Sequence, residues 1–98
     1  MSLERIPLVV TPSQIMSVQL GQQSCRIDIR QRRTGVFVDL YVQDIPVFQG
    51  VKALDRCLLV RDAYLGFTGD LFFADTQGAS DPTYTGFDDR FRLYYETA

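Results

Sequence analysis

The sequence predicts an all-β domain, and three observations lead to this prediction. Apolar and polar residues alternate from Ser24 to Val42, which is typical of strands that bury one face. Gly and Pro interrupt the chain at short intervals, as they do in turns between short strands. About seven such segments follow one another at the close spacing of a small antiparallel β-barrel or sandwich. The alternation does not distinguish these two architectures.

A long antiparallel hairpin is the clearest element, and it occupies Ser24 to Val42. The residues of its apolar face are Cys25, Ile27, Ile29, Val36, Val38, Leu40 and Val42. The opposite face carries Arg26, Asp28, Arg30, Phe37, Asp39 and Tyr41. Because Gly35 adopts a positive φ at little cost, Gln31 to Gly35 is expected to close the two arms as a five-residue loop.

The other strands are expected on either side of this hairpin. They are Ile6 to Val10, Ile15 to Leu20, Val47 to Val51, Leu71 to Asp75 and Phe91 to Glu96. Pro12 ends the first of them because it cannot donate to a ladder. The expected connections are a turn at Gly21 to Gln23, a bend at Asp44 to Pro46 and a long polar loop at Thr76 to Asp89. Gly50 is placed to kink or bulge its strand, and Leu54 to Tyr64 fits either a helical turn or a strand.

Length and composition are those of one folded unit. A chain of 98 residues is near the common size for one hydrophobic core, so residues 1–98 are expected to form a single domain. Residues 1–5 are expected to be flexible, and Met1-Ser2-Leu3 resembles the start that some expression vectors leave. The apolar content of 46% and charged content of 22% are typical of globular chains.

The charge balance argues against two classes of partner. Ten Lys and Arg stand against twelve Asp and Glu, so no general field attracts nucleic acid or anionic lipid. The apolar runs are too short for a membrane span or a signal peptide. We therefore expect a soluble cytosolic product with neither nucleic acid nor membrane as a partner.

The chemical inventory predicts a protein that is not an enzyme. The chain has no histidine, which removes the commonest general base and a common metal ligand. Asp81, Asp88 and Asp89 could gather around calcium, but their spacing does not follow a calcium loop, and a turn-forming acidic loop is the preferred interpretation. No catalytic, metal or cofactor site is expected.

Two further pairs of residues are given structural roles. Gly66 and Gly69 lack the Lys-Ser/Thr that follows a phosphate loop, so they are expected to be turn glycines. Cys25 and Cys57 are expected to be small, reduced core residues. A disulfide between them is the less favoured alternative in a cytosolic product.

Arginine and aromatic residues indicate a candidate interface. Three Arg at the hairpin tip can pair with carboxylates of a partner, and Arg and aromatic residues are enriched at interface cores. The candidates are Arg30, Arg32, Arg33, Phe37, Asp39, Tyr41 and Tyr94. The alternatives are a solvated loop and an outer face that the chain covers with its own loops.

The order of the motifs resembles one known family over nearly the whole chain, from about Ile6 to Glu96. The most specific motifs are GVFVDLY at Gly35 to Tyr41 and RLYY at Arg92 to Tyr95. They resemble the small plug-like proteins of phage contractile-tail baseplates, of the cyanophage baseplate plug type. In that family a Trp usually follows the turn Gly by two residues, where this chain has Phe37, and the Asn that often precedes the turn is absent.

The resemblance implies a structural virion component without an active site. It implies a subunit that packs against the tail hub and the end of the tail tube, with copies of itself around the tail axis as further partners. Such a protein is made in the bacterial host cytoplasm and then becomes part of the baseplate. The alternative function is a stand-alone small β-barrel module that binds a peptide or a sugar in its mouth or in a groove.

Overall fold

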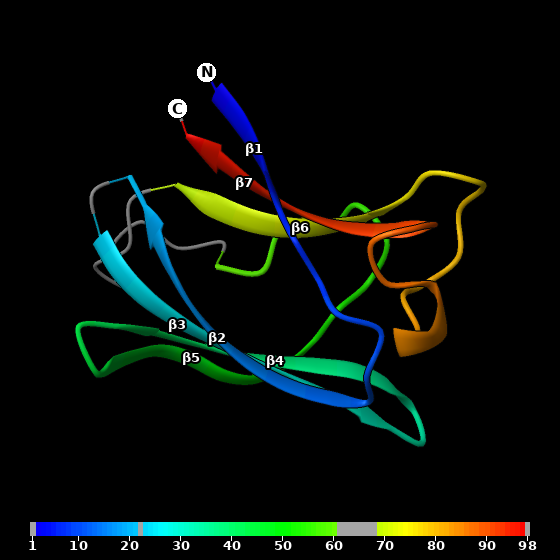
Figure 1. The fold of residues 1–98 in the computed structure, drawn as a ribbon, viewed down its shortest axis with the longest axis horizontal. Coiled ribbons are helices and arrows are strands. Elements are labelled where there is room, and N and C mark those ends of the chain that lie inside the picture. Colours follow the sequence, from blue (N-terminus) through cyan, green and yellow to red (C-terminus); the bar gives the residue numbers. More distant parts are fainter. Residues whose placement is uncertain (1, 22, 61–68, 98) are drawn as a thin grey trace.

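The computed structural model describes residues 2–21, 23–60 and 69–97. Within this part of the chain, seven strands form two antiparallel sheets that face each other as two layers (Figure 1). The first sheet has the order β1 (Ser2–Ile6), β7 (Phe91–Thr97), β6 (Asp70–Asp75). The second has the order β2 (Ser13–Leu20), β3 (Gln23–Arg32), β4 (Gly35–Val42), β5 (Ile45–Lys52). The all-β prediction is confirmed, and of the two expected architectures the chain adopts the sandwich.

The predicted hairpin is β3 and β4, and its register confirms the predicted faces. Ile27 lies opposite Leu40, and Ile29 lies opposite Val38. The predicted five-residue loop is wrong, because the ladder continues to Arg32 opposite Gly35 and leaves only residues 33 and 34 as the turn. Gly35 has a φ of 145°, which glycine adopts at little cost, so the chain reverses within residues 33 and 34 and the arms pair almost to the tip.

The hairpin of β4 and β5 also turns more tightly than predicted. Gln43 and Asp44 form its turn with φ of 51° and 67°, as a type I′ turn requires. Ile45 and Pro46, which were expected in the bend, belong to β5. The β4–β5 register shifts on both sides of Leu40, and Gly50 has a φ of 67°. The predicted bulge at Gly50 is therefore confirmed.

The first strand is displaced from its predicted position. Residues 2–6 pair with β7, from Ser2 opposite Thr97 to Ile6 opposite Leu93, although residues 1–5 were expected to be flexible and Ile6 to Val10 to be the strand. Pro7 cannot donate a backbone hydrogen bond, and it directly follows the last paired residue. Val9 and Val10 are exposed and lie in the connection to β2.

The C-terminal half follows the prediction more closely. β6 and β7 match their predicted ranges within a residue, and their long connection contains one short 3-10 helix, Tyr84–Gly86. Residues 54–60 run beside β6, with an isolated parallel bridge between Asp55 and Phe73. Residues 61–64 of the ambiguous stretch, and the expected turn glycine Gly66, lie outside the described residues.

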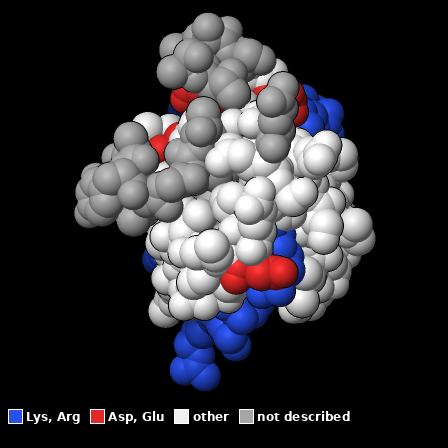
Figure 2. Space-filling view, turned by 90° about the vertical axis from the view of Figure 1, so that its left-hand side faces the viewer, with Lys and Arg blue, Asp and Glu red and all other residues white. Residues whose placement is uncertain are grey.

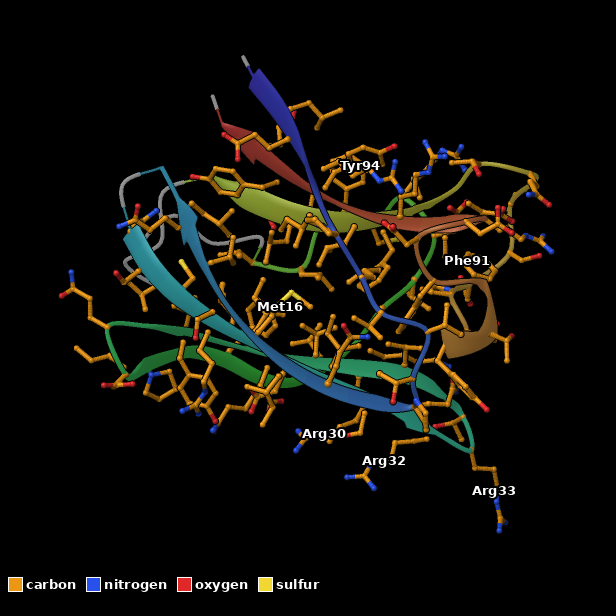
Figure 3. All side chains as sticks on the ribbon, in the orientation of Figure 1. Met16, Arg30, Arg32, Arg33, Phe91 and Tyr94 are labelled. Carbon is orange, nitrogen blue, oxygen red and sulfur yellow. The ribbon has the colours of Figure 1, made fainter. Side chains whose placement is uncertain are left out.

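The hydrophobic core lies between the two sheets. The largest fully buried side chains include Tyr95, Phe73, Phe87, Leu20 and Ile27. In Figure 3, Met16 and Phe91 lie between the layers, whereas Arg30, Arg32 and Arg33 point away from the four-stranded sheet. Among the described residues, no helix has the length and apolar character needed to cross a membrane.

Candidate interaction surface

Six of the seven predicted interface residues lie on or beside the outer face of the four-stranded sheet. Cα pairing places Arg30 opposite Phe37, Asp28 opposite Asp39, and Arg26 opposite Tyr41. Phe37 is half-buried and is not part of the core cluster. The alternation of β3 and β4 therefore brings charged and aromatic side chains together on one face, while their apolar partners fill the core.

Asp39 is an internal support of this face. Only 5% of Asp39 is exposed, because it fills the bulge of β5. One carboxylate oxygen accepts a 2.7 Å hydrogen bond from the Gly50 N–H, and the other accepts a 2.6 Å bond from Arg30 Nη2. Asp39 thus links the bulge to Arg30 and holds the guanidinium over the sheet.

Tyr41 is held by two residues that the sequence did not single out. The guanidinium carbon of Arg26 lies 4.1 Å from the centre of the Tyr41 ring, close enough for a cation–π contact. Gln49 Nε2 donates a 2.6 Å hydrogen bond to the Tyr41 hydroxyl. The register places Arg26 directly opposite Tyr41. On β5 it pairs Tyr41 with Pro46, so only the side-chain hydrogen bond shows that Gln49 reaches Tyr41.

An open hollow lies at the tip end of this face, and we call it the hairpin hollow. Its volume is about 380 Å³, and it is lined by Arg30, Arg32, Thr34, Phe37 and Gly50. Figure 2 shows basic side chains projecting from the lower end of the molecule, where Figure 3 places Arg32 and Arg33. Among the described residues, neither Arg32 nor Arg33 forms an ion pair. One unpaired cation, Arg32, and the aromatic ring of Phe37 therefore border the same hollow.

A comparison with protein families shows what kind of protein presents this face. The model of the family described as cyanophage baseplate Pam3 plug gp18 matches residues 3–98. The chain belongs to this baseplate plug family. No curated protein matches the chain. The resemblance drawn from the sequence motifs is confirmed, and this plug-family chain is a structural component of a phage tail baseplate that associates with other baseplate proteins.

Tyr94, the seventh predicted residue, lies on the opposite side of the plug. Its neighbours Leu93 and Tyr95 are buried, so Tyr94 points outward from the three-stranded sheet (Figure 3). Its ring stacks on Phe72 of β6 at a centroid distance of 5.5 Å. The seven predicted residues therefore belong to two outer faces and not to one continuous surface.

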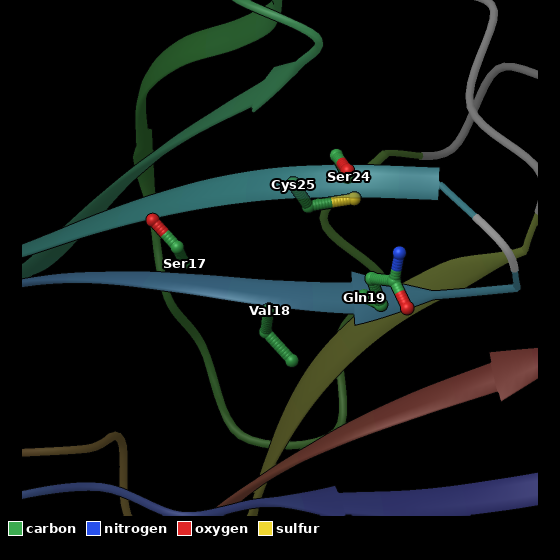
Figure 4. Close-up of a pocket in the computed structure, with 5 residues that line it drawn as sticks. All are labelled: Ser17, Val18, Gln19, Ser24 and Cys25. Carbon is green, nitrogen blue, oxygen red and sulfur yellow. The ribbon is translucent and has the colours of Figure 1, made fainter.

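A second hollow lies where β2 and β3 approach their shared turn. It measures about 180 Å³ and is lined by Ser17, Val18, Gln19, Ser24 and Cys25 (Figure 4). This volume is below the roughly 300 Å³ at which sites for drug-sized ligands begin. Cys25 and Cys57 are both free thiols. Cys25 is a core residue as expected, and burial raises the pKa of its thiol, but Cys57 is only half-buried and lies outside the core cluster, so that part of the prediction is wrong.

The acidic loop of the plug contacts its own chain. Asp81 Oδ1 accepts a 3.0 Å hydrogen bond from the Asp55 N–H, and Asp88 Oδ1 forms a 2.8 Å ion pair with Arg5. Within the described part of the chain, no three His, Cys, Asp or Glu residues lie together so that they could hold a metal ion. These contacts favour a structural role for two of the three aspartates.

Proposed function

We propose that this chain is a plug subunit that packs against the tail hub and the end of the tail tube through its hairpin hollow. One observation carries the proposal: Arg32 lines the hairpin hollow together with the half-buried Phe37, and Arg33 projects from the same tip. Neither arginine has a carboxylate partner among the described residues. Guanidinium groups form two-bond pairs with carboxylates, and an adjacent aromatic ring adds apolar contact area. The partner surface is therefore expected to present Asp or Glu side chains around an apolar centre.

The arrangement of copies around the tail axis determines the symmetry of the contacts between them. A baseplate part that is repeated around the tail axis meets its neighbours through heterologous contacts, which rotation closes into a ring. We propose that the chain is made in the host bacterial cytoplasm and assembles there, with the hub, the tube and copies of itself as partners. A non-enzymatic role agrees with the plug family and with the lack of histidine in the chain.

Co-expression with the hub and tube proteins of the same tail cluster tests the proposal. The wild-type chain is expected to co-purify with at least one of them. The double variant Arg32→Glu, Arg33→Glu should lose at least about tenfold in affinity, since like charges across an interface repel. The variant Arg32→Lys, Arg33→Lys keeps the charge at the same positions and should retain most of the binding. Unchanged binding of a folded Glu variant would show that the hairpin hollow is not the contact.

Tyr94 is proposed as a second contact, on the outer face of β7. The same co-purification assay with Tyr94→Ala tests whether the outer face of β7 contributes to binding. Because Tyr94 stacks on Phe72, the melting temperature of the variant is measured first, so that lost binding is not confused with lost folding. Wild-type affinity in a folded Tyr94→Ala variant would restrict the interface to the four-stranded sheet.

A small-ligand binding module is the second candidate function. The hairpin hollow, at about 380 Å³, falls at the small end of the range of ligand sites. Native mass spectrometry of the purified chain distinguishes the two functions. A bound small molecule that Arg32→Glu removes, together with no binding to hub or tube proteins, would favour the module.

A further inference from the structure

The open edge of β2 is the feature from which a further contact can be inferred. β2 is the edge strand of the four-stranded sheet, and all eight of its residues pair with β3 without a shift in register. The Gln31 N–H donates a 2.7 Å hydrogen bond to the Pro12 carbonyl, which identifies residues 12 and 31 as a hydrogen-bonded pair. Such pairs alternate along an antiparallel ladder. The backbone groups that face the open edge are therefore those of Ser13, Ile15, Ser17 and Gln19.

These groups form a regular row of donors and acceptors. The Ser13 carbonyl accepts a 3.3 Å hydrogen bond from the Thr11 hydroxyl, which agrees with its direction away from β3. Beyond it, the N–H and C=O groups of Ile15, Ser17 and Gln19 have no second strand beside them among the described residues. A free row of this kind is a template for another strand.

Two of the other three sheet edges carry features that oppose strand addition. The β5 edge contains Pro46, Gly50 and Lys52 and two shifts in register. The β1 strand is only five residues long and includes Glu4 and Arg5, of which Arg5 is bonded to Asp88. Proline, bulges, charges and short length are the usual means by which proteins block an edge.

The remaining edge, that of β6, is covered by the chain itself. Residues 55–59 run beside it, and the N–H groups of Arg56 and Leu59 donate to the carbonyls of Phe73 and Leu71 at 2.7 and 2.9 Å. Asp70 accepts further bonds from the N–H groups of Leu59 and Val60. In the described part of the chain, β2 is therefore the edge that is neither covered, bulged nor charged.

We propose that an extended, uncharged segment of a neighbouring baseplate protein adds to β2 as a fifth strand of this sheet. The proposal rests on the proposed function, because it takes its partner from the same assembly. The segment would exchange backbone hydrogen bonds with Ile15, Ser17 and Gln19. One of its side chains would cover Ile15, which is 70% exposed, and alternate ones would extend the layer of half-buried Met16 and Val18.

Charge and size favour this occupant. β2 carries no charged side chain, so a charged residue on the added strand would find no opposite charge directly across the pair. An eight-residue strand is about 27 Å long and a sheet layer is about 10 Å thick, which gives roughly 270 Å² per partner. A second copy held by this strip alone would bury roughly 540 Å² over both partners, which falls short of the roughly 1,200 Å² in total of a stable interface. A segment of a protein that is already bound elsewhere in the baseplate does not need an interface of this size, because tethering raises its effective concentration at β2.

Amide hydrogen exchange on the labelled chain tests the proposal, alone and in complex with the co-expressed hub and tube proteins. In the free chain, the amides of Ile15, Ser17 and Gln19 should exchange at least about 100-fold faster than those of Met16 and Val18. In the complex, the three edge amides should slow by at least about 100-fold. Met16 and Val18 serve as internal references because their amides already bond to β3.

A variant pair provides the second measurement. Ser17→Pro removes an N–H that faces the open edge, where edge strands tolerate proline, and should weaken the complex at least about tenfold. Ser17→Thr keeps the N–H and should bind like the wild type. If Ser17→Pro does not fold, Ile15→Lys is used instead, because it adds a charge to the edge. Ile15→Lys should also weaken the complex at least about tenfold, and its control Ile15→Thr should bind like the wild type.

The outcomes separate this proposal from the proposed function. A complex that forms while the three edge amides exchange as in the free chain overturns strand addition and leaves the proposed function intact. Edge amides that are protected in the free chain, at the mass of a dimer, show that a second copy occupies β2 and overturn the assignment to a partner. A wild-type chain that binds neither hub nor tube protein overturns both.

Discussion

Arg90 holds Asp75 in a two-bond ion pair, with Nε 2.8 Å from one carboxylate oxygen and Nη2 2.8 Å from the other. Asp75 is 1% exposed at the end of β6, and Arg90 directly precedes β7. The same carboxylate accepts hydrogen bonds of 2.9 Å from the N–H groups of Gln77 and Ser80. One buried carboxylate thus ties together both ends of the long loop between β6 and β7.

Removing the charge of Asp75 should destabilise the fold severely. Asp75→Asn removes the charge from the hydrogen bonds that the buried carboxylate accepts from Arg90, Gln77 and Ser80, and it places an amide donor against the guanidinium. Breaking a hydrogen-bonded network around a buried group is strongly destabilising. We expect the melting temperature to fall by roughly 10 °C or more. Asp81→Asn, in the same loop but exposed, is the matched control and should shift it by only a few degrees. Equal shifts would refute the special role of the pair.

The same pair predicts how stability depends on pH. The hydrogen bonds and charge of Arg90 lower the pKa of Asp75 well below the ordinary value, although burial acts in the opposite direction. Because the folded pKa is below the unfolded value of about 3.9, the carboxylate stabilises the fold fully above about pH 5. This stabilisation is lost as the pH falls toward the folded pKa. Urea unfolding should show a gap between wild type and Asp75→Asn that narrows below about pH 4, and a gap that widens there would contradict the assignment.

Two glycines with positive φ should respond differently to alanine. A Cβ at Gly50, where φ is 67°, meets nothing within 4 Å, so only the left-handed backbone opposes it, at about 1–2 kcal/mol. A Cβ at Gly69, where φ is 95°, would lie 2.5 Å from the Glu96 carbonyl oxygen. Chemical unfolding should therefore show at least twice the loss of stability for Gly69→Ala. Similar losses would mean that backbone conformation alone limits both positions.

The two thiols should differ in reactivity. Cys25 is 4% exposed and burial raises its pKa, so little of it is thiolate near neutral pH. Under native conditions iodoacetamide should modify Cys57, which is only half-buried, and should reach Cys25 only after unfolding. Mass spectrometry counts the adducts, and the Cys57→Ser variant should take up none in the folded state. Native labelling of Cys25 at the rate of Cys57 would contradict the packing of β3.

Local patterns predicted the faces of the strands well. Period-two alternation placed Ile27, Val38 and Leu40 in the core, and all three are 0% exposed. It also placed Phe37 and Tyr41 on the opposite face. The prediction was wrong where a strand depends on pairing with a distant segment. At the N-terminus, residues 2–6 form β1 because they pair with β7, near the other end of the chain.

The candidate site was predictable in its residue types and not in its arrangement. Arg30, Arg32, Arg33 and Phe37 were chosen from alternation and turn position, and they border one end of the same face. Asp39 was chosen on the same grounds, but the bulge in β5 buries it against the Gly50 N–H. Tyr94 satisfied the same criteria on β7 and lies on the other sheet, because alternation within a strand says nothing about which sheet that strand joins.

The sequence by itself determined that the chain is built from antiparallel strands, which side chains of the β3–β4 hairpin face inward, and which family its motifs resemble. The strands and their faces depend on neighbours one or two residues apart, and the resemblance depends on the order of short motifs. Only the tertiary structure decided the sandwich, the order of the strands, the Asp75–Arg90 pair and the open edge of β2. Each of these depends on contacts between segments far apart in the chain, and an edge strand is defined by what does not pair with it.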